Sequence, residues 1–144
     1  MGHGEEAVAC FQGGFNCAQA VLSAFVPELG LARELALRVA GALGGGMARS
    51  GATCGAVTGA LMAIGLKYGK CRPGDDAARE RAYALAGEFL RRFQAGHGST
   101  LCRELLGHDL STPAGREAAQ EAGLYETLCP QLVRDAAEIV EELL

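Results

Sequence analysis

The chain has 144 residues, 49% of them apolar, and a formal net charge of −4. This length suits one domain with an ordinary hydrophobic core, so we treat residues 1–144 as a single domain. Acidic and basic residues are interspersed along the chain, which argues against nucleic acid as a partner. The first residues contain neither a basic stretch nor an apolar run, so we expect no secretory signal and a cytoplasmic protein.

Signals typical of helices recur from the N-terminus onward. Alanine, leucine, glutamate and arginine are abundant and β-branched runs are scarce, which predicts an all-α fold. Capping residues, glycines and prolines divide the chain into helical segments. The longer segments are residues 5–12, 17–25, 31–43, 53–67, 76–94 and 130–144, with short elements at 99–106 and after 113. We therefore expect a compact bundle of about six to seven helices.

Two of these segments raise questions about partners. Residues 52–68 are strongly apolar, but a membrane span needs about 20 such residues. The segment is too short, holds three glycines and ends near Lys67, so we interpret it as a buried central helix that does not span a membrane. The C-terminal segment, residues 130–144, has one apolar face. Packing within one chain and formation of a homodimer explain that face equally well.

Six cysteines are unusual in a cytoplasmic chain of this size, where repeated cysteines more often bind metal or carry out redox chemistry. Four of them lie at the start of an expected helix. A helix N-terminus presents unpaired N–H groups and a positive dipole end, which favour a thiolate and lower the cysteine pKa. Both redox and metal chemistry use the thiolate. The four are Cys17, Cys54, Cys102 and Cys129.

The other two cysteines and one histidine have weaker claims to function. Cys10 lies in the middle of an expected helix, where a cysteine behaves as a small apolar residue. Cys71 lies in a polar loop between two cations. Its side chain is either a reactive thiol or an incidental surface residue. His97 lies five residues before Cys102. The roles open to it are those of a ligand, a proton donor or a solvated loop residue.

Glycines surround the second cysteine of the group. Gly55 and Gly59 lie on one helical face, and each costs about 1 kcal/mol relative to alanine. Their presence suggests that a cofactor or another backbone approaches this face, although tight helix packing alone is the alternative. The triple glycine at residues 44–46 predicts a flexible loop.

Four segments carry a resemblance to a known family. They are Gly14-Phe-Asn-Cys-Ala-Gln-Ala-Val21, Cys54-Gly-Ala-Val-Thr-Gly59, Gly98-Ser-Thr-Leu-Cys-Arg-Glu-Leu-Leu-Gly107, and Cys129 with the helix after it. Together they resemble the C_GCAxxG_C_C family of redox-active proteins over nearly the whole chain. The resemblance implies redox activity and one shared site made by Cys17, Cys54, Cys102 and Cys129. Cys10 and Cys71 are extra to the family pattern.

Three functions remain open at this point. The first is electron transfer or redox sensing with a partner protein, through an iron–sulfur cluster of the 2Fe–2S or 4Fe–4S type. The four cysteines would be its ligands, with Gly55 and Gly59 against the cofactor. The second is a metal-free thiol–disulfide oxidoreductase, and the third is a structural Cys₄ zinc site. The choice between them decides whether the protein is an enzyme.

Overall fold

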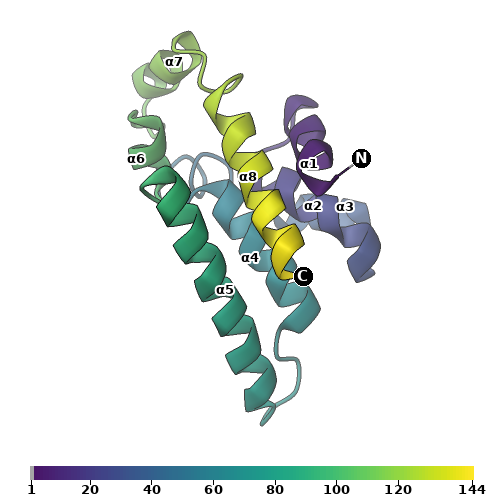
Figure 1. Cartoon of the computed structure of the whole chain (residues 1–144). Helices are drawn as coiled ribbons and strands as arrows, with labels where there is room; N and C mark the ends of the chain where they lie inside the picture. Colours follow the sequence, from purple (N-terminus) through teal and green to yellow (C-terminus); the bar gives the residue numbers. More distant parts are fainter. Residues whose placement is uncertain (1) are drawn as a thin grey trace.

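Eight α-helices follow one another in the computed structural model, which describes residues 2–144 (Figure 1). They are α1 (His3–Gln12), α2 (Cys17–Leu29), α3 (Arg33–Val39), α4 (Gly55–Tyr68), α5 (Asp76–His97), α6 (Cys102–Leu106), α7 (Pro113–Glu121) and α8 (Leu128–Leu143). Within these residues there is no strand, which confirms the all-α prediction. The expected count of six to seven is corrected to eight, because both short elements form helices.

The helices pack around α4. This helix contacts α2, α5 and α8, while α1 lies against α2 and α8. The long helix α5 runs along one side of the molecule, and α7 lies at the end opposite to the α4–α5 turn (Figure 1). The largest fully buried side chains of the core include Phe25, Phe89 and Phe93. The interpretation of residues 52–68 as a buried central helix is confirmed for the first part of α4.

The closest helix contact is the one between α2 and α4. A Cβ atom added to Gly59 would lie 2.6 Å from the carbonyl oxygen of Ala18, and one added to Gly55 would lie 2.9 Å from the Ala18 nitrogen. These distances are too short for any side chain, so the two backbones meet directly. The predicted close approach is confirmed, and it holds the N-termini of α2 and α4 side by side.

The N-terminus of α2 is fixed by a capping box. The side chain of Asn16 accepts a hydrogen bond from the Gln19 amide, and the Gln19 side chain accepts one from the Asn16 amide, both at 2.8 Å. The same two side chains donate to the carbonyl groups of Ala40 (3.1 Å) and Leu37 (2.8 Å). The start of α2 is therefore tied to the end of α3.

Some expected helix ends are wrong. Helix α2 continues through Pro27 and ends before Gly30, whose φ is 76°. Proline lacks one N–H donor, and its ring clashes with the preceding turn of the helix. Favourable packing around the last turn can offset this cost, so a proline is tolerated there. Helix α5 likewise passes Gly96 and ends before Gly98, whose φ is 82°. The residues in left-handed conformation mark both ends.

The apolar spacing of residues 31–43 does not mark the buried side of α3. Leu35 and Val39 have helical spacing, yet they are 56% and 63% exposed. The fully buried residues of this region are Ala36 and Ala40 on the other side. Apolar spacing alone therefore does not identify the buried residues of α3.

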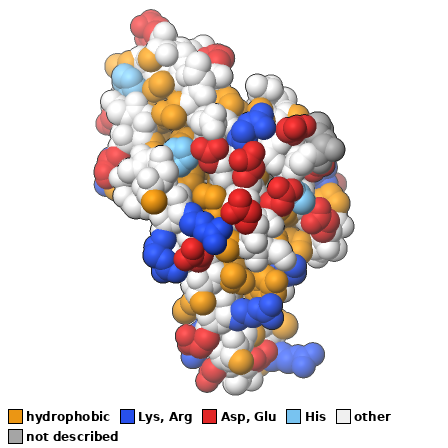
Figure 2. All heavy atoms as spheres, in the orientation of Figure 1, with side chains coloured by type: hydrophobic (Ala, Val, Ile, Leu, Met, Phe, Trp, Pro, Cys, Tyr) orange, Lys and Arg blue, Asp and Glu red, His pale blue; other side chains and the backbone are white. Residues whose placement is uncertain are grey.

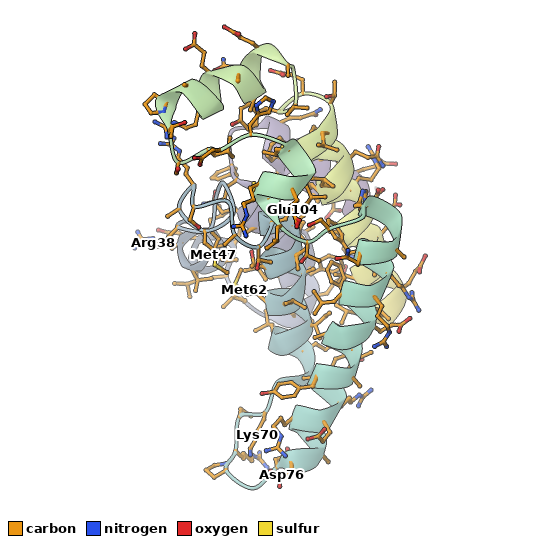
Figure 3. The ribbon with its side chains drawn as sticks, turned by 90° about the vertical axis from the view of Figure 1, so that its left-hand side faces the viewer. Arg38, Met47, Met62, Lys70, Asp76 and Glu104 are labelled. Atoms are coloured by element: carbon orange, nitrogen blue, oxygen red, sulfur yellow. The ribbon has the colours of Figure 1, made fainter. Side chains whose placement is uncertain are left out.

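The surface carries charges of both signs. Figure 2 shows carboxylates and cations next to one another on one face of the molecule. Between α5 and α8, Arg92 pairs with Glu142 at 3.0 Å. At the far tip of the α4–α5 turn, Lys70 and Asp76 pair at 3.1 Å (Figure 3). No helix formed by residues 2–144 has both the length and the apolar character needed to cross a membrane.

Two alanine substitutions in α4 are expected to have opposite effects on stability. Gly59→Ala forces a methyl group against the Ala18 backbone and should lower the free energy of unfolding by about 1–3 kcal/mol. Gly65→Ala meets open space in the same helix and should raise it by up to about 1 kcal/mol. Urea denaturation of both variants checks this. Equal effects would show that the α2–α4 contact is not as close as described.

His3 links three helices, and its contribution should depend on pH. Its ring nitrogens bond to Glu141 and Glu28, each at 2.5 Å, and the ring stacks on Phe25. Burial lowers the pKa of His3, but the hydrogen bonds that its ring donates to the carboxylates of Glu141 and Glu28 outweigh burial and raise the pKa above its usual value. Charged His3 therefore stabilises the fold below about pH 6.5, and this contribution is lost as the pH rises through the folded-state pKa.

The corresponding variant is His3→Gln, compared with the unmodified protein by urea denaturation at pH 6 and pH 9. The substitution should lower the free energy of unfolding clearly at pH 6 and much less at pH 9. The same loss at both pH values would mean that His3 acts through packing on Phe25 rather than through its charge.

Candidate functional site

Four cysteines from four separate segments line one half-open cavity of about 910 Å³. Each lies at the start of a helix, as the sequence predicted. Cys17 is the first residue of α2, Cys54 is the N-cap of α4, Cys102 is the first residue of α6 and Cys129 is the second residue of α8. Cys54, Cys102 and Cys129 are buried, and Cys17 is partly exposed.

A short backbone ladder holds Cys54 beside Cys102. The Cys54 amide donates to the Thr100 carbonyl at 2.8 Å, and the Cys102 amide donates to the Ala52 carbonyl at 2.7 Å. Thr53 and Leu101 form an isolated antiparallel bridge between these two bonds. Two cysteines 48 positions apart in sequence are thereby fixed by main-chain contacts, independently of their side chains.

Cys17 and Cys129 form a hydrogen-bonded pair. The Cys17 thiol donates to the Cys129 sulfur, which raises the pKa of Cys17 well above its usual value and lowers the pKa of Cys129. Burial and the other three sulfurs raise the pKa of Cys17 further. Cys129 is thus the cysteine of this group that most readily carries a negative charge.

The two remaining thiols are held in the protonated form. Burial raises the pKa of Cys54 to about 11, although the backbone N–H groups of Ala56 and Val57 oppose this by donating to its sulfur. Burial and the nearby sulfurs of Cys54 and Cys129 raise the pKa of Cys102 to about 12. The expectation that helix N-termini lower the cysteine pKa values is therefore wrong for three of the four. The hydrogen bond to Cys129 is the largest opposing effect at Cys17, and burial is the largest at Cys54 and Cys102.

The glycine-rich segment beside the cysteines is a left-handed turn. Residues 45–49 all have positive φ, between 52° and 69°, and three of them are not glycine: Met47, Ala48 and Arg49. Left-handed backbone costs roughly 1–2 kcal/mol for each such residue. A Cβ on Gly46 would lie 2.6 Å from the Cys102 Cβ atom, so this turn packs directly on the site. Amides 47–52 all donate to backbone carbonyls, which corrects the expected flexible loop.

The cavity wall beyond the cysteines contains residues that the sequence did not single out. Arg49, Arg116 and Tyr125 line the cavity, together with apolar side chains such as Phe11 and Leu106. Burial and the Cys129 and Cys102 sulfurs raise the pKa of Tyr125, while the two arginines oppose this. These residues lie in polar segments without any motif, so no signal in one sequence could have found them.

The two glycines expected at the site have different positions. Gly55 lines the cavity next to Cys54. Gly59 lies one turn further along α4 and packs against Ala18 instead. Only the first is therefore placed to touch a bound group.

The three residues with weaker claims lie outside the cavity lining. Cys10 is buried, as predicted, and its sulfur accepts a hydrogen bond from Ser23 at 3.4 Å. Cys71 is exposed in the α4–α5 turn. His97 pairs with Asp135 across α5 and α8 at 3.0 Å, so it holds two helices together.

The four thiols share a cavity without forming a ready-made shell around one point. Among residues 2–144, no group of three or more His, Cys, Asp or Glu side chains is arranged to hold a single metal ion. The arrangement offers one hydrogen-bonded cysteine pair, two further buried thiols and an open side through which a molecule can enter.

An all-helical fold with four helix-initiating cysteines around one cavity defines a small protein built for cysteine chemistry. A family model described as "Putative redox-active protein (C_GCAxxG_C_C)" matches residues 15–143, and the chain belongs to this family. The predicted resemblance is thereby confirmed. The comparison with curated proteins gave no match, and neither did the comparison with solved structures.

Replacement of a strained residue in the left-handed turn should stabilise the protein. Ala48→Gly is expected to raise the free energy of unfolding by about 1 kcal/mol, because glycine adopts positive φ without a Cβ clash. The control is Ala84→Gly on the exposed side of α5, which should lower it by about 1 kcal/mol. Urea denaturation distinguishes the two signs. A loss of stability in both variants would contradict the left-handed conformation.

Proposed function

We propose that Cys17, Cys54, Cys102 and Cys129 bind an iron–sulfur cluster of the 2Fe–2S or 4Fe–4S type for electron transfer or redox sensing. The observation that carries this proposal is that four thiols from four segments line one cavity of about 910 Å³. Dithiol chemistry needs only two sulfurs, whereas four cysteines are the usual ligand set of both cluster types. The proposal includes a cytoplasmic location and a redox partner protein.

The residues around the sulfurs suit such a group. The N–H groups of Ala56 and Val57 already donate to the Cys54 sulfur, and hydrogen bonds to sulfur are one determinant of cluster potential. Gly55 lines the cavity without a side chain, so a bound group can approach the start of α4 closely. When bound, the cluster would supply reversible one-electron transfer.

The raised thiol pKa values are compatible with metal binding. Cys54, with a pKa of about 11, and Cys102, with a pKa of about 12, must each lose a proton to become ligands. A cation stabilises the thiolate and drives this loss, so metal uptake should release protons and depend on pH. Before uptake, both sulfurs remain poorly reactive thiols at neutral pH.

A second candidate function is thiol–disulfide exchange, and the contact between Cys17 and Cys129 favours it. A thiol that donates to a neighbouring, more acidic sulfur is the arrangement from which a disulfide forms. In this case the pair would be oxidised by loss of two electrons and two protons to an acceptor disulfide, which would become a dithiol.

One preparation distinguishes the candidates. The protein is purified anaerobically from iron-supplied cells, and its visible spectrum and its iron, sulfide and zinc contents are measured. We expect a brown protein that contains iron and acid-labile sulfide. Cys54→Ser should lose most of both, because it removes one ligand, whereas Cys71→Ser changes only an exposed cysteine and should retain them.

Circular dichroism of both variants establishes that they are folded. A colourless protein with one zinc ion would overturn the proposal in favour of a structural zinc site. A metal-free protein that forms a Cys17–Cys129 disulfide on mild oxidation, identified by mass spectrometry of peptides, would overturn it in favour of the second candidate.

A further inference from the structure

The charged residues of the cavity have one sign only. Arg49 and Arg116 are the only arginine, lysine, aspartate or glutamate residues among the described residues that line it. The chain as a whole has a net charge of −4, so this local excess of positive charge is opposite to the protein's average. The two arginines come from the left-handed turn and from α7, far apart in sequence.

Both arginines have N–H groups available for a ligand. Arg116 donates through Nη1 to the Leu110 carbonyl at 2.9 Å, which orients its guanidinium and leaves further donors. Within residues 2–144, neither arginine forms an ion pair with a carboxylate. Glu126 is not part of the cavity lining; it lines an adjoining hollow of about 370 Å³ that shares Phe11, Phe15 and Tyr125 with the cavity.

The backbone of the same wall adds further donors. Gly44, Gly45 and Gly46 line the cavity, and their amides donate no hydrogen bond to any part of the described chain. In contrast, the six amides that follow, those of residues 47–52, all have a backbone acceptor. Unpaired amides and guanidinium groups both bind oxyanions well.

The rest of the cavity indicates the kind of molecule that carries the anion. Its volume of about 910 Å³ is within the usual range of roughly 300–1,000 Å³ for small-molecule sites. The cavity that holds the arginines and the cysteines also has apolar lining, which Phe11, Phe15, Leu106 and Leu110 contribute. An inorganic ion would leave this wall uncovered, whereas an organic anion would cover it.

We propose that the cavity binds a small organic anion, with its carboxylate or phosphate group at Arg49 and Arg116 and its apolar body towards the cysteines. The anion site itself rests on the arginines, the glycine amides and the apolar wall, and it does not require a cluster. Only its use as the substrate site of a redox centre rests on the proposed function. Tyr125 also lines this cavity, together with both arginines and the four cysteines.

Binding is measured by calorimetric titration with benzoate and phenylphosphonate, with neutral benzamide as the matched uncharged probe. Each titration uses the protein as purified and the same protein after removal of any metal. We expect both anions to bind at least about tenfold more tightly than benzamide, because hydrogen bonds between a guanidinium group and an anion are charge-assisted. A preference for one anion identifies the head group.

The variants are Arg49→Gln and Arg116→Gln, with Arg38→Gln as the control. Arg38 is exposed on α3, outside the cavity lining, and pairs with Glu34 (Figure 3). Each cavity variant should weaken anion binding by about tenfold and leave benzamide binding unchanged, and the control should change neither. Arg49→Gln is decisive, since Arg116→Gln also removes the contact with Leu110.

Equal binding of benzamide and the anions would overturn the proposal. Unchanged anion affinities in Arg49→Gln would also overturn it. An equal fall in Arg38→Gln would do the same, because it would indicate attraction of the anions to any surface cation. These results are separate from the test of the cluster. A protein without iron that still binds the anions through Arg49 would sustain the anion site and remove the cluster alone.

Discussion

The contact between the backbones of α2 and α4 is the constraint on which the rest of the structure depends. Because Gly55 and Gly59 have no side chain, Ala18 and Cys17 can lie directly against α4. Two helix N-termini, each with a cysteine, therefore start at the same place. The ladder between residues 52–54 and 100–102 adds the third cysteine to this place, and the start of α8 adds the fourth. The cavity is the space that remains between these four chain segments.

Much of this arrangement could be predicted from the sequence, for local physical reasons. The helix cap at Asn16, the start of α7 at Thr112-Pro113 and the apolar face of α8 are each recognised from a few neighbouring residues, and each is present. The four cysteines could be grouped because helix starts are local signals. Their pKa values could not, since these depend on burial and on one another, which only the assembled cavity determines.

The errors have the same origin. Leu35 and Val39 follow a helical apolar spacing, but both are exposed, and the fully buried residues are Ala36 and Ala40. The three glycines at residues 44–46 predict a flexible backbone. The segment instead forms a hydrogen-bonded left-handed turn, because Cys102 and Ala52 lie against it. Arg49 and Arg116 belong to no motif, and they line one cavity because the turn before α4 and helix α7 are brought together by the fold. In each case a contact between distant segments decides the outcome.

The left-handed turn also bears on how this protein would change under artificial selection. Close packing explains the glycine at position 46, but residues 47–49 carry side chains at a cost in stability that glycine would avoid. A screen for heat resistance alone should therefore enrich glycine at these positions. Arg49 would be lost in that enrichment, and with it one of the two positive charges of the cavity. Thermostability and the positive charge of the cavity wall thus compete at Arg49.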